Sequence, residues 1–141
     1  MYNNETMQEC IFCKIIKGEI PCNKVYEDET SFAFLDIKPV NFGHTLIIPK
    51  EHFENIYDLP EDTAAHLIKI AKKISMALKK LGADGTNITT NNGEAAGQVV
   101  FHSHIHLIPR FINDGLSHWP TKTYKNEESK EELKKIIQAL E

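Results

Sequence analysis

The feature of this sequence that most constrains its fold is a segment in which every second residue is histidine. Residues 101–108 read Phe-His-Ser-His-Ile-His-Leu-Ile. Because successive side chains of a β-strand point to opposite faces, a strand here places His102, His104 and His106 on one face. The intervening residues can then pack on a core. Three histidines that alternate on one face favour a chemical site over a purely structural strand.

Two kinds of site compete for these histidines. Histidines two residues apart in a strand can share a zinc ion. Alternatively, one imidazole can act as a nucleophile while its neighbours orient it and move protons. The loop of residues 91–97 favours the second, because its glycines let backbone approach a ligand and its turn N–H groups can hold a phosphate. Asn91 and Gln98 add neutral polar side chains beside it.

The remaining pattern predicts an α+β fold with a five-stranded antiparallel sheet. Strands are expected at residues 24–27, 31–35, 44–48, 86–90 and 99–108. One long helix is expected at residues 60–81, with short helices near the two ends at residues 12–18 and 127–140. The long helix has an apolar stripe at steps of three and four, formed by Leu67, Ile70, Ala71, Ile74, Leu78 and Leu81. This element order does not alternate strand and helix as a parallel sheet would.

Composition narrows the class of protein further. The 141 residues are 41% hydrophobic and 26% charged, as in a globular domain, and the formal net charge of −4 argues against a nucleic-acid partner. No apolar run approaches the roughly 20 residues of a membrane span. The polar start lacks the plan of a secretion signal, so we expect a cytoplasmic protein with no membrane partner. We expect one domain, residues 1–141, with a core at about 10–110 and a C-terminal extension at 111–141.

Four segments, in order, resemble the HIT (histidine triad) superfamily of nucleotidyl hydrolases and transferases. The histidine segment is similar to the triad H-φ-H-φ-H-φ-φ. The other segments resemble the family patterns F-x-D-I-x-P, G-H-x-L-φ-φ-P-K and N-x-G…G-Q-x-V-x-H-x-H-x-H, at residues 34–39, 43–50 and 91–106. The branch that the chain most resembles is the bacterial HINT-like purine nucleoside phosphoramidases, which have a HIT-like fold.

This resemblance implies a hydrolase that cleaves a nucleoside 5′-phosphoramidate or mixed nucleotide anhydride at the α-phosphorus, through a nucleotidyl-histidine, and releases a nucleoside monophosphate. By resemblance, His104 is the nucleophile, His106 contacts the phosphate and protonates the leaving group, and His44 supports the triad. The implied substrate-binding residues are Asp36 at the ribose, Asn91, Gln98 and Val99 at the phosphate, and Phe12, Ile15, Phe34, Ile37 and Leu46 at the base. The alternative for the five apolar residues is that they form part of an ordinary hydrophobic core and do not bind the base.

Two other functions stay open at this point. One is a diadenosine polyphosphate hydrolase, and the other is a zinc-stabilised nucleotide-binding module with little turnover. Val99 stands where the family often has Ser or Thr, which predicts an altered leaving-group preference rather than lost chemistry, since one neutral hydrogen bond contributes about 0.5–1.5 kcal/mol.

Three cysteines, an odd number, argue against a disulfide framework, and the C-x2-C spacing of Cys10 and Cys13 indicates metal or redox use. The resemblance implies a structural zinc, since some bacterial relatives hold one with such a pair and two histidines. The matching positions are Cys10, Cys13, His52 and His102, a closed tetrahedral set. The resemblance also implies a two-fold homodimer, a purine nucleotide as substrate, and no organic cofactor.

Overall fold

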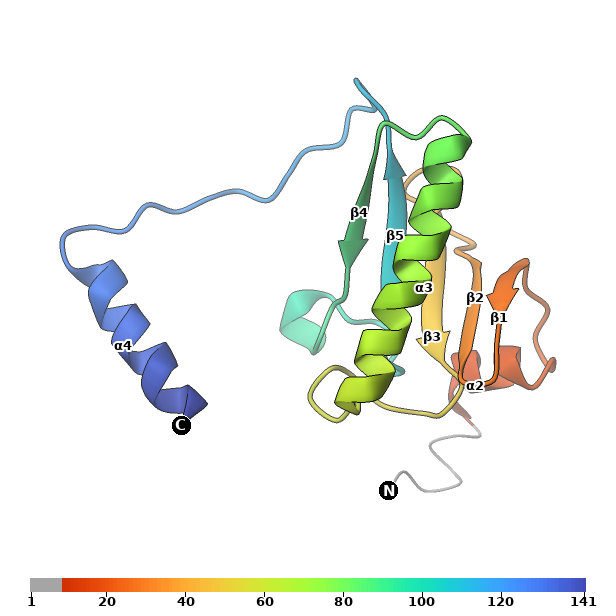
Figure 1. Ribbon diagram of the computed structural model, residues 1–141, viewed down its shortest axis with the longest axis horizontal. Coiled ribbons are helices and arrows are strands. Elements are labelled where there is room, and N and C mark those ends of the chain that lie inside the picture. Colours follow the sequence, from red (N-terminus) through yellow and green to blue (C-terminus); the bar gives the residue numbers. More distant parts are fainter. Residues whose placement is uncertain (1–8) are drawn as a thin grey trace.

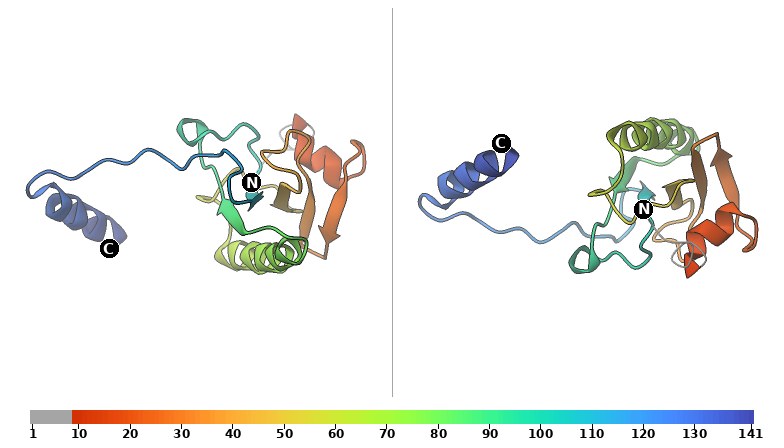
Figure 2. Two further views of the ribbon diagram at one scale, coloured as in Figure 1. Left: turned by 90° about the horizontal axis from the view of Figure 1, so that it is seen from above. Right: turned by 90° about the horizontal axis from the view of Figure 1, so that it is seen from below.

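The computed structural model describes residues 9–141 and shows an antiparallel sheet with a helix on each face (Figures 1 and 2). The strands are β1 (Lys24–Glu27), β2 (Ser31–Leu35), β3 (Thr45–Pro49), β4 (Gly85–Thr89) and β5 (Ile105–Arg110), in the spatial order β1-β2-β3-β5-β4. The helices are α2 (Ile11–Ile16), α3 (Glu61–Lys80) and α4 (Glu128–Leu140), with a 3-10 turn η1 (Glu94–Ala96). The predicted α+β class and five-stranded antiparallel sheet are confirmed.

Strand alternation divides the buried side chains between two cores. On one face, α3 packs its apolar stripe against Ala33, Ile47 and Leu107, none of which is exposed. On the other face, α2 packs against a cluster that includes Phe34 and Leu46. Figure 2 shows α2 and α3 on opposite sides of the sheet. The face that carries α2 is the one on which the histidines lie, since His106 pairs with Leu46 across β3 and β5.

The stripe predicted for α3 is wrong at its last member. Leu67, Ile70, Ala71 and Ile74 are buried, whereas Leu81 is 84% exposed. The reason is that α3 ends at Lys80 and Leu81 is its C-terminal cap, with its N–H bonded back to Ala77 and Leu78. The stripe therefore ends one turn earlier than the periodicity indicates.

The histidine strand begins later than predicted. Residues 99–108 were expected to form it, but β5 starts at Ile105, so only His106 of the three histidines lies within a strand. Continuing the β3–β5 register would bring Ser103 opposite Pro49, which has no N–H to donate. The Ser103 N–H instead donates to the Phe53 carbonyl, at 2.6 Å. This detour turns His102 away from the other two histidines.

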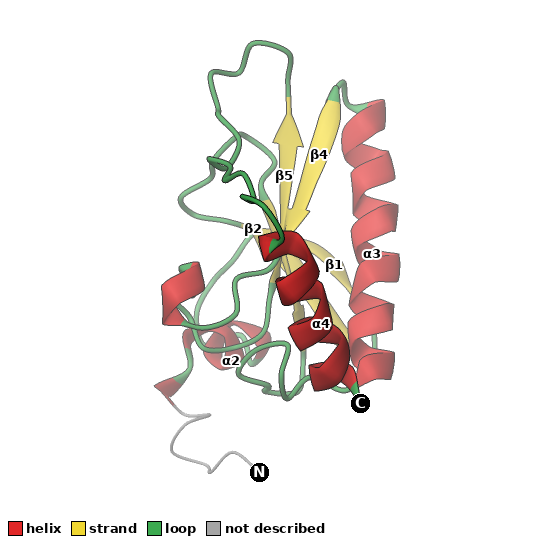
Figure 3. Cartoon of the chain, turned by 90° about the vertical axis from the view of Figure 1, so that its left-hand side faces the viewer, coloured by secondary structure: helices red, strands yellow, loops and turns green. Residues whose placement is uncertain are grey.

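After β5 the chain runs on to α4, which stands apart from the sheet in Figure 1 and lies in front of it in the view of Figure 3. The apolar side chains of α4, Leu133, Ile136, Ile137 and Leu140, are 50–81% exposed. Within residues 9–141, no helix is both long and apolar enough to cross a bilayer. The polar residues at the start of the chain, which led us to expect no secretion signal, fall largely in residues 1–8, outside the described residues.

Candidate active site and metal centre

Three imidazoles gather where β3 and β5 meet. His44 directly precedes β3, and its Nε2 lies 3.0 Å from Nδ1 of His106 in β5. The His104 ring lies 4.9 Å from the His106 ring, centroid to centroid. His44 and His104 are buried, at 3% and 6% exposed, while His106 is half-buried. The structure thus brings together the three residues for which the sequence analysis predicts catalytic roles.

Backbone groups determine which nitrogen of each ring carries the proton. The Val40 N–H donates to His44 Nδ1 at 3.2 Å, so His44 holds its proton on Nε2 and donates it to His106 Nδ1. A neutral His106 then carries its own proton on Nε2. His104 Nδ1 donates to the His102 carbonyl oxygen at 2.6 Å, which leaves the lone pair on His104 Nε2. The cluster therefore offers one bare Nε2, on His104, and one Nε2–H, on His106.

Burial keeps these rings neutral near pH 7. Desolvation lowers the pKa of His104 below its ordinary value. Desolvation, with repulsion from His104 and His44, lowers the pKa of His106 to about 4. Burial also lowers the pKa of His44, although Asp36, whose Oδ2 lies 3.8 Å from His44 Nε2, opposes the shift. The lone pair of His104 is thus available at neutral pH.

A second cluster joins α2 to the segments that follow β3 and precede β5. Cys10 caps the N-terminus of α2 by accepting from the Cys13 N–H. The Cys13 Sγ lies 3.4 Å from His52 Nδ1 and 3.6 Å from His102 Nδ1, and the Cys10 Sγ lies 3.5 Å from His102 Nδ1. The two Nδ1 atoms are 3.2 Å apart. All four candidate ligand atoms lie within 4.8 Å of one another.

These spacings fit a tetrahedral zinc ion. Bond lengths of about 2.3 Å to sulfur and 2.0–2.1 Å to nitrogen place two nitrogens about 3.4 Å apart, and a sulfur and a nitrogen about 3.6 Å apart. His102 donates from Nε2 to the Pro49 carbonyl at 2.9 Å, so its Nδ1 lone pair faces the cluster. The His52 and His102 Nδ1 atoms lie close enough together for one ion to bind both. The four residues could therefore hold zinc with no open position.

The apolar residues predicted to bind the base are divided between core and surface. Phe12 and Ile15 of α2 are buried together with Phe34 and Leu46 of the sheet, in the core between them. Phe12 also stands edge-on to the His104 ring, with centroids 5.3 Å apart. Ile37 is 86% exposed, as is Val99, predicted at the phosphate. The structure therefore places only part of this set beside the histidines.

The polar residues predicted at the substrate also differ in their surroundings. Asp36 lies beside His44, and its Oδ1 accepts from the Lys38 N–H. Gln98 is buried, and its amide bonds to backbone groups of Gly93, Glu54 and Val100. Its side chain is thereby engaged in holding the loop before the histidines.

A pocket of about 530 Å³ opens beside His44 and His106, on the sheet face opposite α3. Asn91 lines it, together with residues that sequence reasoning did not single out, namely Asn87, Thr89, Ile108 and Arg110. Strand alternation could have indicated these residues from the sequence. Asn87 and Thr89 lie on one face of β4, and His106 and Arg110 lie on one face of β5. Residues 116–120, which include His118 and Trp119, form the outer wall.

The sequence matches the HIT domain over residues 17–113, about two thirds of the chain. The chain belongs to the HIT domain family. This HIT protein is 43% identical to adenosine 5′-monophosphoramidase of Schizosaccharomyces pombe, over 86% of its own length and 90% of the relative's. Its fold is similar to that of a HIT family protein from Bacillus subtilis, with a TM-score of 0.84 and 44% identity over 92% and 96% of the two chains. A zinc-bound histidine triad protein from Mycobacterium smegmatis is 40% identical, with a TM-score of 0.77 over 95% and 96% of the chains.

Proposed function

We propose that this HIT-family hydrolase cleaves nucleoside 5′-phosphoramidates and related mixed nucleotide anhydrides at the α-phosphorus, with His104 as the nucleophile. The observation that carries the proposal is the hydrogen bond from His104 Nδ1 to the His102 carbonyl, because it places the proton on Nδ1 and leaves the lone pair on Nε2 for attack. The family and the phosphoramidase relative support the reaction class.

In this mechanism, His104 Nε2 forms a bond to the α-phosphorus while the bond from phosphorus to the leaving nitrogen breaks. The anionic phosphate raises the pKa of His106, which takes up a proton from solvent when the substrate binds. The His106 imidazolium then gives its Nε2 proton to the leaving amine and returns to the neutral form. Water then attacks the nucleotidyl-His104 phosphorus and returns a proton to His106. The P–N bond to His104 breaks, and a nucleoside monophosphate leaves.

A substrate panel tests the reaction class. The panel contains adenosine 5′-phosphoramidate, adenylyl sulfate and a diadenosine polyphosphate, each assayed for release of nucleoside monophosphate. We expect the highest kcat/KM for the phosphoramidate. A higher kcat/KM for the diadenosine polyphosphate would favour the alternative function, a diadenosine polyphosphate hydrolase. No turnover of any substrate, with nucleotide still bound, would favour a binding module and contradict the proposal.

The pH dependence of kcat/KM follows from the burial of His104. Protonation of its Nε2 removes the nucleophilic lone pair, and an ordinary imidazole is half-protonated at a pH of about 6.5. Because burial lowers the pKa of His104, we expect kcat/KM to stay level as the pH falls from 8 through 6.5, and to decline only below that value. A pH–rate profile measures this, and a half-maximal rate at or above pH 6.5 would contradict it.

We also propose that Cys10, Cys13, His52 and His102 hold one structural zinc ion. Their spacing and the zinc-bound relative support this. Zinc supplies no step of the reaction here, since four protein ligands leave no position for substrate. His102 nevertheless connects the two clusters, because its ring faces the cysteines and its carbonyl orients His104. The ion would thereby stabilise the backbone that positions the nucleophile.

We propose that the nucleotide substrate carries a purine base. We also propose that the protein works as a homodimer. Within the described sheet, β4 is an edge strand with one side unpaired, and the apolar face of α4 is exposed. Both features favour burial against a second copy. Sedimentation analysis measures the oligomeric state.

A further inference from the structure

The peptide group that links His102 to Ser103 makes a hydrogen bond on each side. Its carbonyl oxygen, that of His102, accepts from His104 Nδ1 at 2.6 Å. Its N–H, that of Ser103, donates to the Phe53 carbonyl at 2.6 Å. His102 and Ser103 are 0% and 5% exposed, so water does not compete for this peptide group. Phe53 therefore fixes the plane of the peptide group that orients the His104 ring.

The two hydrogen bonds also strengthen each other. When the Ser103 N–H donates, the peptide group is polarised and its carbonyl oxygen becomes a better acceptor for the proton on His104 Nδ1. A stronger bond at Nδ1 leaves more electron density at Nε2, the atom that attacks. Without the Phe53 carbonyl, the buried Ser103 N–H would have no partner and the peptide group could rotate.

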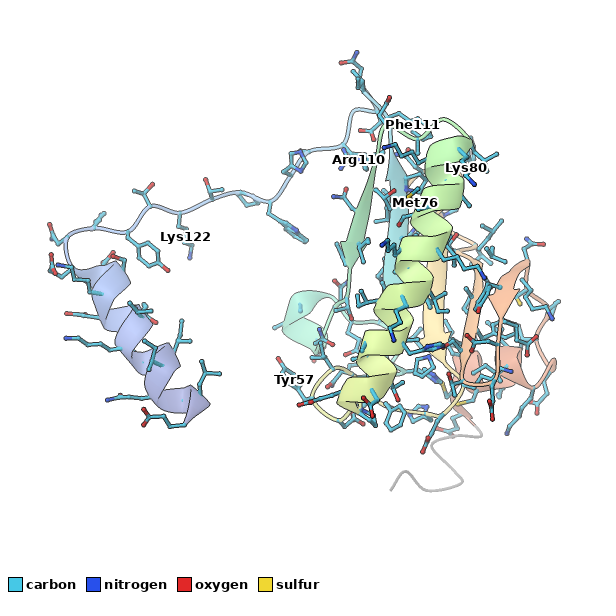
Figure 4. The ribbon with its side chains drawn as sticks, in the orientation of Figure 1. Tyr57, Met76, Lys80, Arg110, Phe111 and Lys122 are labelled. Carbon is cyan, nitrogen blue, oxygen red and sulfur yellow. The ribbon has the colours of Figure 1, made fainter. Side chains whose placement is uncertain are left out.

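The Phe53 carbonyl belongs to a segment, residues 53–58, that lies between β3 and α3 and contains no helix or strand. Figure 4 shows Tyr57 of this segment near the N-terminal end of α3. The Asp58 carboxylate accepts from the N–H groups of residues 54 and 55, both at 3.0 Å, and closes the segment into a turn. These bonds shape the segment but do not attach it to the histidines.

Two side chains attach the segment to the loop that precedes the histidines. Asn92 Oδ1 accepts from the Ile56 N–H at 2.9 Å. Gln98 Nε2 donates to the Glu54 carbonyl at 2.6 Å and to the Val100 carbonyl at 3.1 Å. Gln98 is 4% exposed, and both of its amide hydrogens are donated to backbone, so it has none left for a substrate phosphate.

We propose that Asn92 and Gln98 are positioning residues, which hold residues 53–58 so that the Phe53 carbonyl orients the nucleophile through the peptide group between His102 and Ser103. This inference rests on the proposed function, which makes His104 the nucleophile. Neither Asn92 nor Gln98 contacts the substrate. Loss of either side chain should therefore slow the attack on phosphorus and leave nucleotide binding unchanged.

The test compares Asn92→Leu with Asn92→Asp in the full chain, because both replacements are close to asparagine in size. Leucine cannot accept from the Ile56 N–H, whereas aspartate keeps an acceptor oxygen. In Asn92→Leu, we expect kcat for adenosine 5′-phosphoramidate to fall about tenfold, with KM within about twofold of wild type. Asn92→Asp should restore kcat to within about twofold of wild type. Asn92→Ala should act as Asn92→Leu does if the latter does not fold.

Asn55→Leu is the matched control. Asn55 is half-buried like Asn92, and its Oδ1 also accepts a backbone N–H, that of Tyr57 at 3.0 Å. This bond lies within residues 53–58 and does not reach the loop before the histidines. Its removal should leave both kcat and KM unchanged.

Proton NMR of the His104 ring measures its orientation without turnover. The Nδ1 proton of a 2.6 Å bond resonates far downfield, and its signal is assigned by its absence in His104→Asn. We expect this signal to move upfield in Asn92→Leu and to stay in place in Asn92→Asp and Asn55→Leu.

The outcomes separate this inference from the proposed function. Unchanged kcat in Asn92→Leu, a fall in kcat with the His104 signal unmoved, or an equal fall in Asn55→Leu would overturn the inference. A raised KM in Asn92→Asp would do so too, because it would place Asn92 against the anionic phosphate. All four leave the proposed function intact, whereas a rate near wild type in His104→Asn would contradict the proposed function itself.

Discussion

Replacing His104 with alanine is expected to lower kcat by on the order of 10⁴-fold or more, while nucleotide affinity stays within a few-fold of wild type. The reason is chemical. His106 carries its proton on Nε2, and His44 Nε2 is hydrogen-bonded to His106, so neither ring can replace the bare Nε2 of His104. Single-turnover kinetics with adenosine 5′-phosphoramidate, alongside equilibrium binding of the monophosphate, measure the two quantities.

The control for this variant is His66→Ala. His66 lies on α3 and bonds through Nε2 to Asp28 at 2.9 Å, away from the histidine cluster. Its removal should leave kcat unchanged. Because His104 packs against Phe12, His104→Asn provides a second variant closer in volume, and it should be equally inactive. A rate near wild type in either His104 variant, with the fold intact, would contradict the assignment of the nucleophile.

Loss of the metal-ligand set is expected to have the largest effect on stability. We expect purified protein to contain about one zinc per chain, and Cys13→Ser to lose the ion and more than about 4 kcal/mol of unfolding free energy. Domains of this size have about 5–15 kcal/mol in total, so the variant should be close to unfolding at 37 °C. Metal analysis and denaturant titration, with and without a chelator, measure both effects.

Cys22→Ser is the matched control for the metal site. Cys22 is half-buried beside the core under α2, outside the four-residue set, so its replacement should leave the zinc content unchanged. The wild-type chain should also lose kcat when a chelator removes the ion, because the His102 carbonyl that orients His104 is held through this site. Full zinc occupancy in a Cys10→Ser and Cys13→Ser double variant would show that the ligand set is wrong.

The fold was predictable because each of its elements has a local pattern. The three-and-four spacing of Leu67, Ile70 and Ile74 is enough to indicate α3 and its buried face. The alternation of residues indicated the face on which the histidines lie. The start of β5, in contrast, depends on Pro49 of β3, which has no N–H to donate the next hydrogen bond between the two strands. Strand ends of this kind are set by tertiary pairing, which local pattern does not contain.

The candidate site was predictable in its residue types and less so in its hydrogen bonding. The spacing of Cys10 and Cys13 indicated metal or redox use, and resemblance supplied the two histidines. The protonation of the His44 and His104 rings depends on the backbone N–H of Val40 and the backbone carbonyl of His102. The types of these two residues do not indicate that their backbone groups make these hydrogen bonds. Arg110 was missed for the same reason, since its partners become neighbours only in the folded chain.

The central claim is that His104 Nε2 takes the nucleotidyl group, and the most direct measurement is mass spectrometry of the protein quenched during turnover of adenosine 5′-phosphoramidate. Quenching at alkaline pH preserves a phosphorus–nitrogen bond that acid would break. We expect a chain heavier by one adenylyl group, with the added mass mapping to His104 in the peptide that spans residues 101–110. An adenylyl group on another residue, or product formed in the first turnover with unmodified protein at every time point, would contradict it.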